Sequence, residues 1–348
     1  MTAGYSMKAA GIECRRALDY GRMGSVIFEL KKSYIYFSKF FSMSIPTTRT
    51  KEDAVISINV ELCTGCGLCV KACCSDMLKI ENGKAAELYG KSVFNCIACG
   101  HCMAICSEGA ITITGRTMSP GDVFDLSSAA SDATYEQLMS LYSRRRSVRK
   151  FNQKTVESEV IEKILAAART APMGLPPSDV HVLVLHGREK VTAFTKDFAQ
   201  FLKSMKYLVS GWFLAMMRPF WGKATDEMFR NFMRPLFDNY IGEMEKGNNY
   251  ITYDAPLAMY FYGSPYSDPA DPIVAATYAM HAGEALGLGT CMLGAIHPFI
   301  QRGKKAEQFR KVHGIKYKSQ EGLFVIFGYH DLKYKKGVKR TFADETFA

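Results

Sequence analysis

Eight cysteines in two runs of equal spacing are the residues best suited to chemistry in this 348-residue chain. The first run consists of Cys63, Cys66, Cys69 and Cys73, and the second of Cys96, Cys99, Cys102 and Cys106. Two residues separate the first three cysteines of each run, so three thiolates from one tight loop can converge on one iron-sulfur cluster. The fourth cysteine follows after three residues and leaves along a helix toward another cluster. The spacing therefore predicts two [4Fe-4S] clusters.

Structural zinc is the alternative interpretation of closely spaced cysteines. Zinc sites also use Cys-x-x-Cys pairs, but they take two pairs from separated loops and have no use for the third cysteine of each run. The spacing therefore favours iron-sulfur clusters. Because such clusters are labile to oxygen, we expect a reducing compartment and a cytoplasmic protein.

The two runs resemble those of the two-cluster bacterial ferredoxins. This resemblance implies crossed ligation, in which each cluster takes three cysteines from one run and the fourth from the other. One cluster would be bound by Cys63, Cys66, Cys69 and Cys106, and the other by Cys96, Cys99, Cys102 and Cys73. The chain departs from the family's pattern after the fourth cysteine, where the usual proline is Cys74 in one run and Ser107 in the other.

Length and composition indicate that a second domain accompanies the cysteine runs. The chain is too long for a ferredoxin alone and predicts about two domains, and its 48% hydrophobic residues suffice for a large core. The net charge of +10 comes without a nucleic-acid motif, so we expect a phosphate-bearing cofactor and an acidic partner protein rather than nucleic acid. No apolar stretch has the length of a membrane span.

Short strands should position the cysteines. Residues 54–60 and 110–114 have strand character on either side of the two runs, which predicts a two-cluster domain over 46–118. Residues 119–134 contain Ser, Pro and Gly and predict a linker, with a second domain over 135–348. Residues 1–45 form an extension to which we assign no role, and translation from Met43 is the alternative.

The second domain mixes long helices with short strands, so we expect an α+β fold with several helices packed on a sheet. Helices are predicted over 135–142, 160–170 and 272–286, and strands over 180–185, 258–263 and 323–329. Apolar residues at helical spacing over 198–216 and 229–244 predict a helical hairpin, inserted at about 198–247. It would form a subunit contact, a lid over a pocket, or ordinary core.

A basic segment follows the first predicted helix of the second domain. Arg145, Ser147 and Arg149 alternate there. A phosphate group needs planar guanidinium groups, a hydroxyl donor and a cation from another direction. The segment resembles the Arg-x-Ser-x-Arg signature of the FMN-dependent nitroreductase family, while a solvated basic face is the alternative.

The resemblance to the nitroreductases continues along the chain. Residues 171–177 resemble a loop beside the flavin ring, residues 287–294 a Gly-Leu-Gly-Thr-Cys loop, and 339–340 a C-terminal basic pair. Glycines would let the backbone approach a flat ring. The resemblance implies a nitroreductase-like mixed sheet and a homodimer with FMN at the subunit interface. The implied flavin-binding residues are Arg145, Arg146, Ser147, Arg149, Met173, Gly174, Leu293, Gly294, Lys339 and Arg340.

Together these features predict an oxidoreductase, because clusters pass single electrons whereas flavin accepts them singly and releases two together. We expect a ferredoxin or flavodoxin to donate electrons, and FMN to reduce a small-molecule acceptor such as a nitroaromatic, quinone or activated alkene. No side chain is assigned as a catalytic acid or nucleophile. Two alternatives stay open. NAD(P)H could reduce the flavin and the clusters carry electrons outward, or the protein could be a non-catalytic electron relay.

Overall fold

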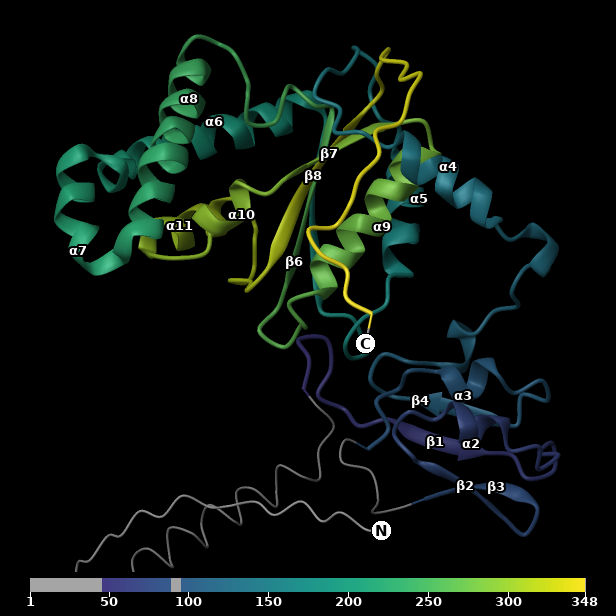
Figure 1. Cartoon of the computed structure of the whole chain (residues 1–348). Helices are drawn as coiled ribbons and strands as arrows, with labels where there is room; N and C mark the ends of the chain where they lie inside the picture. Colours follow the sequence, from purple (N-terminus) through teal and green to yellow (C-terminus); the bar gives the residue numbers. More distant parts are fainter. Residues whose placement is uncertain (1–45, 89–94, 348) are drawn as a thin grey trace, which may run out of the picture.

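The computed structural model describes residues 46–88 and 95–347. A small cysteine-rich unit lies next to a larger domain, and an extended segment that leads to helix α4 connects them (Figure 1). The extension predicted over 1–45, with the alternative start at Met43, lies outside the described residues. None of the helices in the described ranges is long and apolar enough to cross a bilayer.

The cysteine-rich unit contains two antiparallel strand pairs and two short helices. Its elements are β1 (Val55–Ile58) with β4 (Ile111–Thr114), β2 (Leu78–Glu81) with β3 (Lys84–Glu87), α2 (Leu68–Ala72) and α3 (His101–Ala104). Strands β1 and β4 confirm the strands predicted over 54–60 and 110–114. The β2–β3 hairpin was not predicted, although Asn82 and Gly83, both at positive φ, form a typical two-residue turn.

The larger domain is built on one sheet with the strand order β5, β6, β8, β7. The strands are β5 (Val180–His186), β6 (Leu257–Gly263), β8 (Gly322–Gly328) and β7 (Gly289–Leu293). Their pairing is antiparallel, and a parallel bridge joins Ser147 to Thr290 at the β7 edge. Three of the strands confirm those predicted at 180–185, 258–263 and 323–329.

Helices cover both faces of this sheet, which confirms the predicted α+β fold (Figure 1). One face carries α5 (Ser158–Arg169) and α9 (Asp271–Ala285), with α4 (Tyr135–Arg144) packed on α9. The other face carries α6 (Arg188–Ser204), α10 (Ile296–Phe299) and α11 (Lys304–Val312). Side chains alternate between the two layers, since Met259 and Phe261 pack toward α9 while Tyr260 packs toward α6.

The segment 287–294, expected to be a loop, is a strand over most of its length. Residues Gly289–Leu293 form β7 and pair with β8. Buried backbone groups need hydrogen-bond partners, and the otherwise open edge of β8 supplies them. The loop prediction was therefore wrong for these residues, because the tertiary partner overrides the local glycines.

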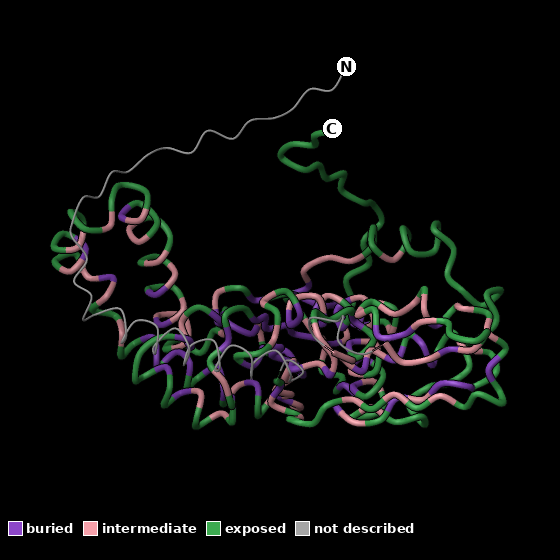
Figure 2. The backbone as a smooth tube through the Cα atoms, turned by 90° about the horizontal axis from the view of Figure 1, so that it is seen from below, coloured by how far each residue is buried: buried purple, intermediate pink, exposed green. Residues whose placement is uncertain are grey.

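The predicted helical hairpin is divided into more pieces than the apolar spacing indicated. It comprises the end of α6, a 3-10 turn (Lys206–Val209), α7 (Gly211–Met228), a π-helical turn (Phe229–Met233) and α8 (Arg234–Glu245). The continuous helix expected over 198–216 was wrong, because the chain leaves the helix after α6. Gly222, at φ 72° and ψ 171°, adds a kink within α7. This insertion projects from one end of the domain (Figure 1), whereas the C-terminal segment is exposed along its length (Figure 2).

A glycine substitution in α9, with a matched substitution in α8 as its control, tests how closely α9 packs on the sheet. A Cβ at Gly283 would lie 3.0 Å from the ring of Phe327 and 3.1 Å from the methyl group of Thr290. Because both neighbours are fully buried, Gly283→Ala should lower the free energy of unfolding by about 1–3 kcal/mol. The control Gly242→Ala in α8, with nothing within 4 Å of the added Cβ, should raise it by up to about 1 kcal/mol. Urea unfolding followed by circular dichroism measures both, and equal effects would contradict the close packing.

Candidate functional site

The cysteines gather around two small cavities in the cysteine-rich unit. The first cavity is lined by Cys63, Cys66, Cys69 and Cys106, and the second by Cys73, Cys96, Cys99 and Cys102 together with Cys74. Each run thus sends its fourth cysteine to the group formed by the other run. This is the crossed grouping that the ferredoxin resemblance implied. We call the two sets the first and the second thiol group.

Tight turns and short helices place these thiols. In the first run Cys69 lies within α2 and Cys73 directly follows it. Gly65 must lack a side chain, because a Cβ there would lie 2.0 Å from the carbonyl oxygen of Gly83. The turn of the β2–β3 hairpin therefore closes directly over the loop that carries the first thiols.

Backbone amides point at three of the sulfur atoms. Each of these N–H groups donates at 3.3 Å, in the pairs Ala85 to Cys63, Met77 to Cys73 and Ala110 to Cys106. The amides of Ala85 and Gly65 lower the pKa of Cys63, whereas burial raises the pKa of Cys102 to about 12. Donors of this kind stabilise anionic sulfur, and they are one of the ways in which proteins set the potential of a cluster.

The thiol groups fit clusters better than the zinc alternative. Within 46–88 and 95–347, no three His, Cys, Asp or Glu side chains converge closely enough to hold a single metal ion. A zinc site would place its sulfur ligands at about 2.3 Å from one ion. In a [4Fe-4S] cluster each cysteine binds a different iron, so the thiols surround a volume, as these two cavities do.

The basic segment lies along the β7 edge of the larger sheet. Ser147 bridges Thr290, and the N–H of Val148 donates to the Thr290 carbonyl at 2.9 Å. Gly289 makes this approach possible, since a Cβ there would lie 2.7 Å from Val148. The segment is thereby held in extended form, with Arg145 at one end and the exposed Arg149 at the other.

Several buried polar atoms face this segment without a partner. Glu284 and His281 of α9 and His330 after β8 each have a buried side-chain atom that lacks a hydrogen bond to the described residues. Burial raises the pKa of Glu284, which His330 and Arg145 oppose, and burial lowers the pKa of His281. Unsatisfied buried atoms mark a place where a polar group belongs, so the surroundings of Arg145 fit a ligand with hydrogen-bonding groups.

The C-terminal segment also passes this place. Gly337 lies next to Arg146, whose guanidinium nitrogen would be 3.8 Å from an added Cβ. Lys339 and Arg340 follow shortly after and are exposed. The structure therefore brings the predicted basic pair to the neighbourhood of the basic segment.

The other predicted flavin residues lie elsewhere. Leu293 and Gly294 are at the far end of β7, with Leu293 buried in the core and Gly294 exposed. Residues 171–177 precede β5, at the opposite end and opposite edge of the sheet from the Ser147 bridge. One chain therefore does not bring the ten predicted residues together.

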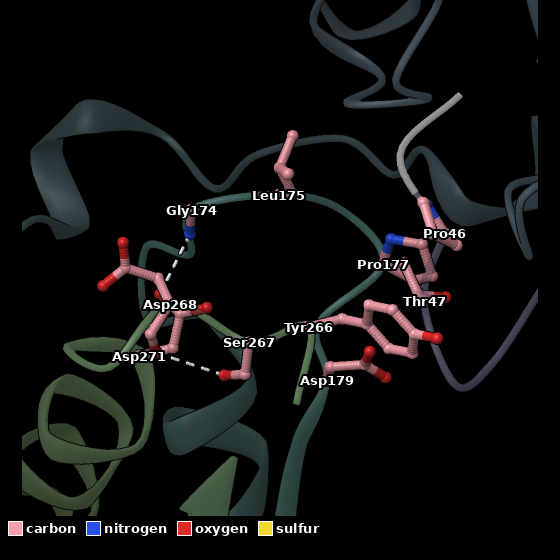
Figure 3. Close-up of a pocket in the computed structure, with 10 residues that line it drawn as sticks. All are labelled: Pro46, Thr47, Gly174, Leu175, Pro177, Asp179, Tyr266, Ser267, Asp268 and Asp271. Atoms are coloured by element: carbon pink, nitrogen blue, oxygen red, sulfur yellow. Dashed lines mark hydrogen bonds between the residues drawn. The ribbon is translucent and has the colours of Figure 1, made fainter. Parts of the chain in front are cut away.

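Within that loop, Gly174 and Met173 differ in what they can offer a ligand. The N–H of Gly174 donates to Asp271 at 2.9 Å, at the wall of a pocket of about 230 Å³ (Figure 3). Its amide is therefore already engaged and is not free to approach a flavin. The side chain of Met173 is 36% exposed and lines a different, larger cleft.

That cleft, of about 700 Å³, lies between the two domains. The cysteine-rich unit contributes Cys99, Met118 and their neighbours, and the larger domain contributes residues 171–173 and 176–178. Arg116 donates to the Pro176 carbonyl at 2.8 Å, and Thr48 donates to Asp179. These cross-domain residues were not predicted, because an isolated Arg or Asp carries no spacing signal.

Family models match both parts of the chain. The model of the nitroreductase family matches residues 142–329, which is more than half of the chain. The model of a 4Fe-4S dicluster domain matches residues 58–111, which contain both cysteine runs. No curated protein sequence matches the chain.

Three solved structures illustrate the likeness of the larger domain. The FMN-bound nitroreductase from Bacteroides fragilis is 17% identical, with a TM-score of 0.42, over 60% of this chain and 99% of that one. The FMN-bound nitroreductase from Desulfitobacterium hafniense is 20% identical, with a TM-score of 0.39, over 59% and 97%. The BluB-like flavoprotein from Clostridium difficile is 16% identical, with a TM-score of 0.41, over 59% and 94%. These identities and scores are low, and the family models carry the assignment.

Paired cysteine variants test the crossed grouping. Cys63→Ser with Cys106→Ser removes two ligands of the first thiol group, so about four of about eight irons per chain should remain. Cys63→Ser with Cys73→Ser removes one ligand from each group and should deplete nearly all iron. Iron and acid-labile sulfide per chain, measured after anaerobic reconstitution, report both results. The reverse ranking would establish uncrossed groups.

Proposed function

Because the chain belongs to the nitroreductase family and carries a 4Fe-4S dicluster domain, we propose that it is an iron-sulfur flavoprotein oxidoreductase that uses FMN. Its electrons would come from a low-potential donor such as a ferredoxin or flavodoxin and pass through two [4Fe-4S] clusters to the flavin. Bound FMN would supply the two-electron chemistry that reduces a nitroaromatic, quinone or activated alkene. Oxygen-labile clusters favour a reducing compartment such as the cytoplasm.

One observation supports this proposal most directly. Cys99 of the second thiol group and Met173 of the predicted flavin loop line the same cleft. The structure thus joins a cluster-binding unit to the part of the larger domain that the family resemblance places next to the flavin. A chain that merely carried two independent domains would have no need of such a contact.

The basic segment has the groups that FMN phosphate requires. Arg145 and Arg149 can each bind two phosphate oxygens through a planar guanidinium group, and Ser147 can donate its hydroxyl. Arg146 differs from its two neighbours, because its guanidinium already donates to the Arg145 carbonyl at 2.8 Å. The exposed Lys339 and Arg340 supply cations from the C-terminal side.

A homodimer would complete the flavin site. The basic segment and residues 171–177 lie at opposite ends of the sheet. Within one subunit, therefore, the two segments do not come together. A second subunit could set its own 171–177 loop against the basic segment of the first. This separation supports the dimer, with FMN at its interface, that the family resemblance implies.

The described side chains support flavin-centred chemistry rather than a protein nucleophile. Cys291 is 1% exposed, and burial raises its pKa, so it is poorly suited to act as a thiolate. His297 is buried and hydrogen-bonded to Tyr260 at 2.8 Å, which is a structural role. The chain's own contribution is to bind and orient the cofactor and to admit the acceptor.

Removing the phosphate contacts should release FMN. In the variant Arg145→Ala with Arg149→Ala we expect loss of most bound flavin, because two bidentate contacts to phosphate disappear. The matched control is Arg144→Ala with Lys150→Ala, which removes two exposed cations from the same segment and should retain flavin. Flavin fluorescence after denaturation of the purified proteins gives the content. Full retention in the first variant would place the phosphate elsewhere.

The direction of electron flow is tested at the second thiol group. Cys99→Ser should abolish the bleaching of flavin absorbance by reduced ferredoxin, because it removes a ligand next to the cleft. Dithionite, which reduces flavin directly, is the control and should still bleach it. Rapid bleaching of the unmodified protein by NADPH alone would contradict this direction and favour outward flow. Reduction without turnover of any acceptor would indicate an electron-relay subunit.

A further inference from the structure

We propose that Arg116 is a positioning residue that holds the second thiol group against the 171–177 loop and raises the reduction potential of the group those thiolates bind. This inference rests on the proposed function, since it takes the thiolates to be cluster ligands. The inference assigns different roles in electron transfer to the two thiol groups. The second faces the flavin domain, and the first faces the external donor.

Arg116 lies in a turn that fixes where its side chain goes. The turn follows β4 and is closed by the N–H of Met118, which donates to the Gly115 carbonyl at 2.8 Å. A Cβ at Gly115 would lie 2.4 Å from the carbonyl oxygen of Asp53, so the turn packs directly on the chain ahead of β1. Arg116 itself has a φ of 49° and is only 2% exposed. Its guanidinium is therefore directed into the contact between the domains.

The guanidinium acts on groups of both domains. It donates to the Pro176 carbonyl at 2.8 Å in the predicted flavin loop. Its charge also acts on the carboxylate of Asp53 and on the thiol of Cys96, a member of the second thiol group. One buried cation thus contacts the flavin loop and lies within electrostatic reach of the second group.

Because Arg116 is buried, its charge must be compensated by neighbouring groups. A charge removed from water is destabilising unless opposite charge and hydrogen bonds compensate it. Asp53 supplies one compensating charge, and an anionic cluster held by Cys96 and its neighbours would supply more. A positive charge near such a cluster favours its reduced, more negative form and so raises its potential.

The first thiol group has a cation of its own within the cysteine-rich unit, because Lys84 donates to the carbonyl of Cys63 and its charge helps to lower the pKa of that thiol. Its cavity is lined only by residues from Ile58 to Ile111, all in the cysteine-rich unit, and Cys66 is exposed there. The second group differs because Cys99 also lines the cleft between the domains. Arg116 therefore acts on the inner group and leaves the outer one unaffected.

The test measures the midpoint potential of each cluster separately. The background variant Cys63→Ser with Cys106→Ser leaves only the second cluster, and Cys73→Ser with Cys102→Ser leaves only the first. We expect Arg116→Gln to lower the midpoint of the second cluster and to leave the first unchanged, in redox titrations followed by electron paramagnetic resonance. Arg116→Lys, which keeps the charge, should restore most of the lost potential.

Arg49→Gln is the matched control. Arg49 also donates across the domains, to the Ser178 carbonyl at 3.3 Å, but it is an exposed contact. It should therefore change neither midpoint. Iron content and circular dichroism of each variant show whether it has folded and loaded.

The outcomes separate this inference from the proposed function. Equal shifts at both clusters, no shift with Arg116→Gln, or the same shift with Arg49→Gln would overturn the part given to Arg116 while leaving the oxidoreductase intact. If Arg116→Gln fails to fold, Arg116→Lys carries the test, and a midpoint of its second cluster well below that of the unmodified protein would overturn the inference in the same way. Failure of the unmodified protein to bind iron would overturn both.

Discussion

The joining of the two domains depends on buried charge that must find partners across their contact. Asp179 is buried, and its two carboxylate oxygens accept hydrogen bonds from the backbone and hydroxyl of Thr48 and from the hydroxyl of Ser264. An unpaired carboxylate in this place would cost several kcal/mol. Thr48 lies ahead of β1, whereas Asp179 directly precedes β5. This carboxylate therefore ties the entry of the small unit to the edge of the large sheet.

Residue spacing was sufficient to predict those parts of the structure in which ligand residues or buried apolar residues recur at a regular interval. The cysteine runs and the apolar strands β6 and β8 were predicted from their own residues, because thiol spacing and continuous burial leave local marks. Strand β7 was missed because its pairing depends on a partner far away in the chain, and the end of α6 was missed because apolar spacing continues through the break. The roles of Arg116 and Asp179 could not be predicted from the sequence, since they depend on hydrogen bonds that each residue makes with the other domain.

The helical insertion lies closer to the basic segment than its place in the sequence indicates. Burial raises the pKa of Tyr240 of α8, and the charge of Arg149 lies close enough to oppose that shift. The guanidinium carbon of Arg149 is also 5.7 Å from the centre of the Tyr253 ring. The insertion thus reaches the basic segment on the side away from α9. Its residues shape the space that a cofactor or acceptor would enter there.

The turn of the β2–β3 hairpin carries a consequence for how the protein matures. Gly83 sits where a side chain on Gly65 would be, and the amide of Ala85 is bonded to the sulfur of Cys63. The hairpin and the first thiol loop therefore reach their final positions together, and a cluster bound by that loop would stabilise the hairpin as well. The larger domain contains none of these residues, so this coupling between cluster binding and folding would be confined to the small unit.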